Sequence, residues 1–230
     1  MTKIPIIDLS LIHNDNIESK QKIAKQIYQT CHEIGFIYVK YYNLSPKLIN
    51  QVFDYSKYLF DLPLDTKQNM AWSDEFSNQG YVGIEREKLN PNNPGDLKEA
   101  FNIVKLDNLP TSLSISPAIP SFYKACTEIA NTILTAFSLA LELPEDFFTT
   151  NHNQQNHTLR LLHYPALKQQ PKPGQIRAGE HSDYGSITLL FQDDMVGLEV
   201  QTVTKEWIAV PKITDTILVN TGDLMQRWTN

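Results

Sequence analysis

Apolar residues recur at helical spacing in several stretches of the first part of the chain. In residues 19–34 they fall at every third or fourth position, and Gly35 follows as a typical C-terminal stop. The same spacing predicts helices over residues 45–62 and 121–143. Short β-branched or aromatic runs predict strands at residues 4–9, 36–39 and 100–104. The pattern therefore predicts a first part that is mainly helical.

The pattern changes after Thr158, where short apolar or alternating runs are separated by turn residues. Such runs cover residues 158–164, 181–191, 198–201, 207–210 and 216–220. Several short strands at this spacing are typical of a sandwich or jelly roll. We therefore expect an α+β protein in which a helical N-terminal half packs around a β second half, with one shared core.

Three regions follow from this pattern. Residues 1–110 hold strands and helices, residues 111–150 a long support helix, and residues 151–230 a partial jelly roll. Residues 73–94 are polar and rich in Asn, Gly and Pro, so they are expected to form a long loop region. Long loops in compact domains are often functional.

Composition narrows the class of protein. The chain has 230 residues, and its formal charge of −6 argues against general binding to nucleic acid. Its sequence has no apolar run long enough to span a membrane and no signal peptide, so a cytoplasmic protein is expected. Cys31 and Cys126 fall on apolar helix faces and are interpreted as reduced, buried thiols. Composition leaves the oligomeric state open.

The main candidate for chemistry is His181-Ser182-Asp183, which opens an apolar run. On a strand, residues i and i+2 face the same side, so His181 and Asp183 could both point at one ion. An imidazole and a carboxylate are two of the three ligands in the facial triad of non-heme Fe(II) oxygenases. An H-x-D pair is weak by itself, since the alternative is a hydrogen-bonded His–Asp pair at the surface.

Further motifs give this pair a context. The chain resembles the iron- and 2-oxoglutarate-dependent dioxygenase superfamily, in particular the group related to isopenicillin N synthase. The resemblance covers nearly the whole chain and combines several segments. They are residues 4–9, 35–39, 80–81, 96–101, 159–165, 181–190 and 220–230.

The resemblance implies a double-stranded β-helix core and a metal centre. His181 and Asp183 would bind Fe(II), and 2-oxoglutarate and O2 would occupy the open positions, with ascorbate as an additional candidate. A small organic substrate would be hydroxylated, desaturated or cyclised, with succinate and CO2 as co-products. Some relatives do without 2-oxoglutarate, so the use of this co-substrate is itself an inference.

Other residues have two interpretations each. Tyr164 occupies the place of a tyrosine that often reaches the 2-oxoglutarate carboxylate, or it is a buried strand residue. Arg160 lies in an apolar strand, where it would pair with a carboxylate of a substrate or co-substrate, or with an internal acid. Tyr81 and Tyr184 are candidates for the substrate wall.

The chain also departs from the family. His181 is the last histidine, whereas relatives have a distal His ligand and an Arg-x-Ser pair further on. The remaining candidates, His152, His157 and His163, are interpreted as structural or exposed. We therefore expect the last strands to be missing, and this chain to bind iron weakly and to be inactive or nearly so.

Two rival functions remain open. The chain could be a non-catalytic protein of the same fold that binds a ligand or a partner. A zinc hydrolase is weaker, because it needs the same ligands plus a general base, and no H-E-x-x-H motif is present.

Overall fold

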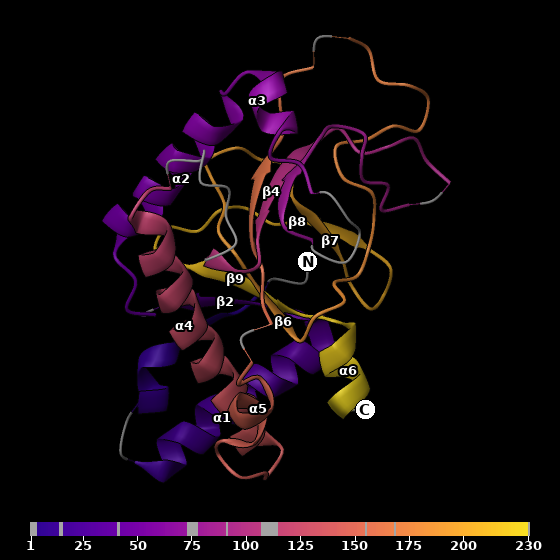
Figure 1. Cartoon of the computed structure of the whole chain (residues 1–230). Coiled ribbons are helices and arrows are strands. Elements are labelled where there is room, and N and C mark those ends of the chain that lie inside the picture. The colour runs from indigo at the N-terminus through magenta and orange to yellow at the C-terminus, as the bar shows by residue number, and fades with distance from the viewer. Residues whose placement is uncertain are drawn as a thin grey trace. The chain divides into compact units, whose positions relative to one another are not determined.

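The computed structural model describes residues 4–13, 16–40, 42–72, 78–90, 92–106, 115–154, 156–167 and 169–229. The chain forms two compact units (Figure 1). Unit 1 comprises Met1–Pro46, Lys124–Gln154 and Ser182–Asn230, and unit 2 comprises Lys47–Tyr123 and Gln155–His181. None of the described helices is long and apolar enough to cross a membrane.

Unit 1 is built on a sheet of strand order β1-β2-β9-β6. The strands are β1 (Ile6–Asp8), β2 (Phe36–Lys40), β9 (Ile217–Thr221) and β6 (Ile187–Leu190). β1 and β2 run parallel, and the other neighbours are antiparallel. Parallel neighbours need a crossover connection, which here is η1 (Leu9–His13) followed by α1 (Ile17–Ile34).

The helix predicted over residues 19–34 is confirmed as α1. It begins two residues earlier because the side chain of Asn16 accepts hydrogen bonds from the backbone N–H groups of Glu18 (2.9 Å) and Ser19 (3.1 Å). Gly35 ends it with φ of 80°, a conformation that favours glycine. Capping chemistry in the sequence therefore fixes both ends of this helix.

α4 (Ala118–Ala140) and α5 (Phe147–Asn151) follow. The helix predicted over residues 121–143 is α4, which starts and ends about a turn earlier. Its end comes before Glu142, which adopts a left-handed conformation with φ of 57°. Within unit 1, Phe137 of α4 packs edge-on against Tyr28 of α1. Cys31 and Cys126 are both free thiols; Cys31 is buried and Cys126 is half-buried. Burial raises the pKa of each thiol to about 12, as expected for packed, unreactive cysteines.

A hairpin of β7 (Glu199–Gln201) and β8 (Trp207–Ala209) covers part of the unit 1 sheet. Its Val200 joins a buried cluster with Tyr38 and Leu218 of the sheet. The chain then forms β9 and α6 (Asp223–Thr229). The strands predicted at residues 198–201, 207–210 and 216–220 are thus present.

Unit 2 holds an antiparallel sheet of strand order β3-β4-β5. The elements are β3 (Gly80–Val82), β4 (Glu99–Ile103) and β5 (Leu159–His163), with α2 (Pro46–Phe60) and α3 (Leu64–Gln68). Every residue of the central strand β4 is buried. The predicted loop at residues 73–94 contains the strand β3, which its Gly-rich and polar composition did not predict. Residues 73–77 and 91 of this loop lie outside the described residues.

Candidate functional site

The segment that carries His181 and Asp183 differs from the prediction. The strand expected over residues 181–191 is formed only from Ile187, so neither residue lies on a strand. The backbone oxygen of Asp183 accepts a hydrogen bond from the backbone N–H of Asp223 at the start of α6 (2.7 Å). The ladder of β6 with β9 begins at Ile187, opposite Thr221, and this bond lies beyond it. The argument from alternating strand faces is therefore wrong, although the two residues remain neighbours along the chain.

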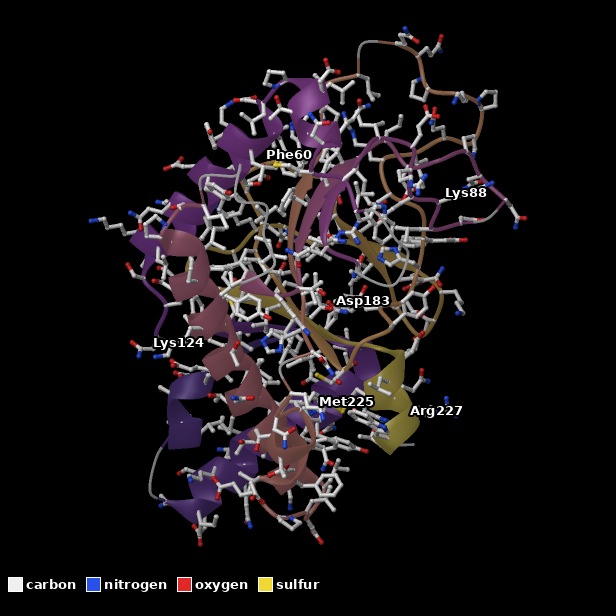
Figure 2. All side chains as sticks on the ribbon, viewed as in Figure 1. Phe60, Lys88, Lys124, Asp183, Met225 and Arg227 are labelled. Carbon is white, nitrogen blue, oxygen red and sulfur yellow. The ribbon has the colours of Figure 1, made fainter. Side chains whose placement is uncertain are left out.

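Within unit 1, the side chain of Asp183, which is labelled in Figure 2, is hydrogen-bonded to two strands of the sheet. Its Oδ2 accepts hydrogen bonds from Oγ1 of Thr188 on β6 (2.5 Å) and from Nδ2 of Asn220 on β9 (2.7 Å). Gly222 lies close behind, since a Cβ there would be 2.5 Å from the backbone oxygen of Asp183. The carboxylate is half-buried and fixed in one orientation by two strands.

In unit 2, the ring of His181 is exposed, and its Nδ1 lies 2.8 Å from the backbone oxygen of Gly179. A carbonyl oxygen only accepts hydrogen bonds, so Nδ1 carries the proton. The neutral ring then has its lone pair on Nε2. A histidine that binds a metal through one ring nitrogen usually donates a hydrogen bond of this kind from the other.

The chemistry of these donors fits a divalent iron. A carboxylate held by neighbouring donors and an imidazole with a fixed tautomer are a typical pair of metal ligands. In the described part of the chain, no three His, Cys, Asp or Glu side chains come together as a metal site. Among the described residues, His181 and Asp183 are therefore candidates for two metal ligands, and no third side chain of these types joins them.

Arg160 and Tyr164 both belong to unit 2. The guanidinium of Arg160 bonds to Glu87, which is the internal ion pair foreseen as one of its two interpretations. Arg160 does not point into the core, because β5 buries Leu161 and turns Arg160 outward. Tyr164 is 44% exposed, and burial of its hydroxyl raises its pKa, with Arg160 opposing the shift.

The two candidates for the substrate wall lie in very different surroundings. Tyr81 is only 3% exposed, and its hydroxyl donates a hydrogen bond to Oε2 of Glu99 (2.5 Å). Tyr184 is 89% exposed. In the structure as described, Tyr81 is therefore committed to a buried polar cluster, whereas Tyr184 is open to solvent.

The histidines interpreted as structural do make structural contacts. His163 Nδ1 lies 2.7 Å from Oε1 of Glu99, and His157 stacks on Tyr123. His152 lies 2.7 Å from Oγ of Ser186. None of the three is grouped with a further pair of metal-ligating side chains in the described part of the chain.

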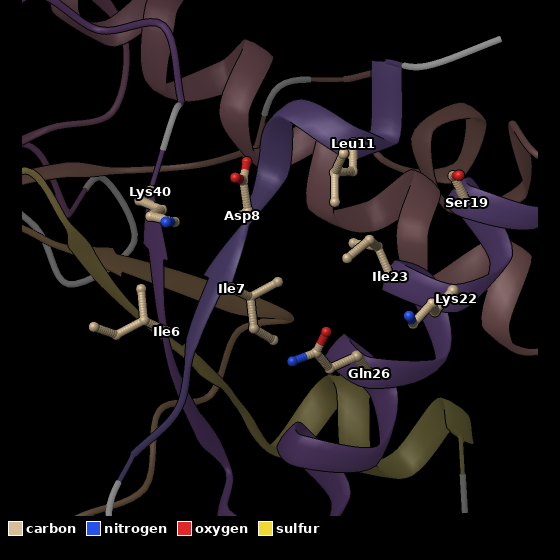
Figure 3. A pocket seen from close by; sticks show the side chains of 9 residues that line it. All are labelled: Ile6, Ile7, Asp8, Leu11, Ser19, Lys22, Ile23, Gln26 and Lys40. Atoms are coloured by element: carbon tan, nitrogen blue, oxygen red, sulfur yellow. The ribbon is translucent and has the colours of Figure 1, made fainter. Parts of the chain in front are cut away.

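A hollow of about 420 Å³ lies between β1 and α1 in unit 1 (Figure 3). Ile7 and Ile23 line it together with polar side chains such as Lys22 and Gln26. None of the predicted site residues lines this hollow.

Sequence reasoning missed the residues that orient the pair. Thr188, Asn220 and Gly179 each contact His181 or Asp183 directly. Thr188 and Asn220 lie in segments that resemble the family. A polar residue in a strand cannot be recognised as a hydrogen-bond donor to a metal ligand, however, until its partner is known.

The mixed helical and antiparallel architecture can be compared with that of known families. Two family profiles match the chain. Residues 4–118 match the profile described as non-haem dioxygenase in morphine synthesis N-terminal, and residues 154–230 match that of the 2OG-Fe(II) oxygenase superfamily. The chain belongs to the 2OG-Fe(II) oxygenase superfamily, as the resemblance implied.

Individual relatives agree with this assignment. The chain is 31% identical to proline hydroxylase buaE of Petromyces alliaceus, over 97% of this chain and 76% of that protein. It is 29% identical to the 2-oxoglutarate-dependent dioxygenase htyE of Aspergillus rugulosus, over 99% of this chain and 76% of that protein. A full-length Neurospora crassa protein, crystallised in complex with alpha-KG, superimposes with a TM-score of 0.87 at 33% identity, covering 98% of this chain and 75% of that one.

The predicted fold class and type of enzyme are thereby confirmed. The fold is the jelly-roll α+β fold of 2OG-Fe(II) oxygenases, and the protein is an oxidoreductase of that family. Fe(II), 2-oxoglutarate and O2 are the cofactor and co-substrates of this family.

Proposed function

We propose that His181 and Asp183 bind Fe(II) in an enzyme that oxidises a small organic molecule with 2-oxoglutarate and O2, and that the 230 residues, with this pair of ligands alone, bind iron weakly and are inactive or nearly so. The observation that carries the proposal is the pair of donors, Thr188 and Asn220, that fix the carboxylate of Asp183. In a surface His–Asp pair, the carboxylate would be solvated and would not be expected to accept hydrogen bonds from two strands. Neither donor would be expected if Asp183 were simply a solvated turn residue.

The chain's own residues have distinct roles in this proposal. His181 presents Nε2 because Gly179 accepts the hydrogen bond from the proton-bearing Nδ1. Asp183 supplies an anionic oxygen whose orientation is set by β6 and β9. When bound, the iron with 2-oxoglutarate and O2 supplies the oxidising power, and succinate and CO2 are the co-products.

Tyr164 and Arg160 are the residues that we propose for 2-oxoglutarate. Tyr164 stays protonated because its pKa is raised, so its hydroxyl can donate to a carboxylate. Arg160 is exposed enough to meet an anion, but it must share its guanidinium with Glu87. Tyr164→Phe is therefore expected to raise the KM for 2-oxoglutarate more than Arg160→Lys does.

The substrate class is proposed from the relatives and from exposure. The similar Neurospora crassa protein was crystallised with thymine, and buaE is described as a proline hydroxylase. We therefore propose a small polar substrate, with the exposed Tyr184 as a contact. Hydroxylation, desaturation and cyclisation are all compatible with the pair of ligands.

The experiment is an assay of succinate formation with Fe(II), 2-oxoglutarate and a panel that begins with thymine and free proline. Residual turnover in the parent chain that is lost in both His181→Ala and Asp183→Ala supports the assigned ligands, whereas turnover at rates typical of an enzyme would overturn the expected inactivity. Turnover that survives in either variant contradicts the assigned ligands. Binding of 2-oxoglutarate without any succinate would favour the rival, a ligand-binding protein of the same fold.

A further inference from the structure

A buried acid–base pair lies next to the segment that leads to His181 in unit 2. Asp96 and Lys98 are 3% and 6% exposed, and Nζ of Lys98 lies 2.5 Å from Oδ2 of Asp96. Glu87 adds a second acid, 3.3 Å from the same nitrogen. Burying such a pair has a large desolvation cost, and well-packed apolar residues often stabilise a fold as well or better. Stability alone therefore does not account for Asp96.

The other oxygen of Asp96 reaches the segment before the metal ligand. Its Oδ1 accepts a hydrogen bond from the backbone N–H of Gly179 at 3.1 Å, in a buried position. The carbonyl of the same Gly179 is the acceptor for Nδ1 of His181 at 2.8 Å. The contacts thus run from Asp96 through a single glycine to the imidazole.

The backbone around Gly179 is held against the loop that precedes β4. A Cβ at Gly179 would lie 2.9 Å from the backbone nitrogen of Asn90, so the segment sits too close for a side chain. Two more hydrogen bonds join the same stretches. Nε2 of Gln175 donates to the backbone oxygen of Gly95 (2.9 Å), and the backbone N–H of Leu97 donates to the backbone oxygen of Ile176 (3.0 Å). Among these bonds, the one that Asp96 accepts is the nearest to His181 along the chain.

We propose that Asp96 is a positioning residue for the metal ligand His181. By accepting from the N–H of Gly179, it restrains the backbone of this residue, and this restraint helps to keep the Gly179 carbonyl, which belongs to the next peptide group, directed at Nδ1. The imidazole is thereby kept in the tautomer that offers Nε2 to iron. Lys98 holds the carboxylate of Asp96 in place for this task. The inference rests on the proposed function, because it assigns His181 to the metal.

The test uses the full chain and the variants Asp96→Ala, Asp96→Asn and Gln175→Ala. Gln175→Ala is the matched control, because it removes a bond between the same two stretches without touching Gly179. Asp96→Asn keeps a carbonyl oxygen that can accept from Gly179. In Asp96→Ala, Lys98 still has Glu87 as a partner, so the variant is expected to fold.

The first readout is the tautomer of His181 in the metal-free protein, from proton–nitrogen correlation spectra of the histidine rings assigned with His181→Ala. The proton is expected on Nδ1 in the parent, in Asp96→Asn and in Gln175→Ala, and distributed over both nitrogens in Asp96→Ala. The second readout is the affinity for Fe(II), which should fall about tenfold in Asp96→Ala alone, a usual effect of losing an outer-shell partner.

The outcomes separate the two proposals. If Asp96→Ala keeps the parent's tautomer, or resembles Gln175→Ala in both readouts, Asp96 has no positioning role. If His181→Ala binds Fe(II) as well as the parent does, the assigned metal site is wrong. The tautomer measurement still decides then whether Asp96 orients the ring.

Discussion

Among single residues, Asp183 has the most informative surroundings. Thr188 and Asn220, which donate to its Oδ2, both lie on strands, and they differ in kind, since one offers a hydroxyl and the other an amide. Metal-binding carboxylates are usually supported in this way. The hydroxyl of the threonine can be removed with little change of shape, and this makes Thr188 the better target for mutation.

Thr188→Val is expected to weaken Fe(II) binding about tenfold, because the carboxylate of Asp183 loses a donor that orients it. The free energy of unfolding should fall by about 1.5–3 kcal/mol, the usual contribution of a hydrogen bond to a charged group. Metal titration and urea unfolding measure the two effects. An unchanged affinity in a destabilised variant would mean that Thr188 serves the fold alone.

A second residue, Glu99, lies at the centre of a buried polar cluster in unit 2. It accepts hydrogen bonds from Lys67 (2.8 Å), Tyr81 (2.5 Å) and His163 (2.7 Å). Burial raises the pKa of Glu99, but these donors outweigh burial and leave the pKa below its ordinary value of 4.5. The ionised form is therefore the one that the fold stabilises.

Glu99→Gln should destabilise the protein by about 3–5 kcal/mol near neutral pH, because the ammonium of Lys67 loses its buried partner. A lowered pKa adds stability above pH 4.5, and this part is lost as the pH falls through the folded-state value. The parent should thus lose more stability than the variant as the pH falls from neutral into the acid range, as followed by urea unfolding at several pH values. Parallel pH profiles would contradict the assignment.

At the scale of elements, the sequence is a good guide where local chemistry decides. Asn16 and Gly35 mark the two ends of α1, and the apolar spacing marks its buried face. The strand expected from residue 181 begins only at Ile187, because a strand ends where its partner ends, and β9 ends at Thr221, opposite Ile187. The outward position of Arg160 could not be predicted either, since only the pairing of β5 with β4 shows which face of β5 is exposed.

The junction between β9 and α6 leaves no space for a side chain at Gly222, next to the backbone of Asp183. Gly222→Ala would push its Cβ against the backbone oxygen of Gly185 and to 2.5 Å from that of Asp183. It should lower the free energy of unfolding by about 1–3 kcal/mol and weaken metal binding, because the Asp183 segment must shift. Gly185→Ala is the control, since a Cβ there meets nothing within 4 Å. Equal behaviour of the two variants in urea unfolding and metal titration would refute this role for Gly222.

For the whole molecule, the family follows from several short motifs taken together, and profiles over residues 4–118 and 154–230 agree with it. The sequence could predict the class of chemistry because iron ligands have a restricted set of residue types. It could not predict the contacts that orient them, such as Asn220 to Asp183, because these depend on strand register. The formal charge of −6 says nothing about the substrate, since the local field at the site decides that.

The proposed role of His181 as an iron ligand can be measured by anaerobic titration with Fe(II) and excess 2-oxoglutarate. The charge-transfer absorption of the iron–2-oxoglutarate complex is followed in the parent, in His181→Ala and in His157→Ala, a histidine that stacks on Tyr123 instead. We expect a weak band in the parent and in His157→Ala and its loss in His181→Ala. A band of equal strength in the parent and in His181→Ala would show that His181 is not an iron ligand.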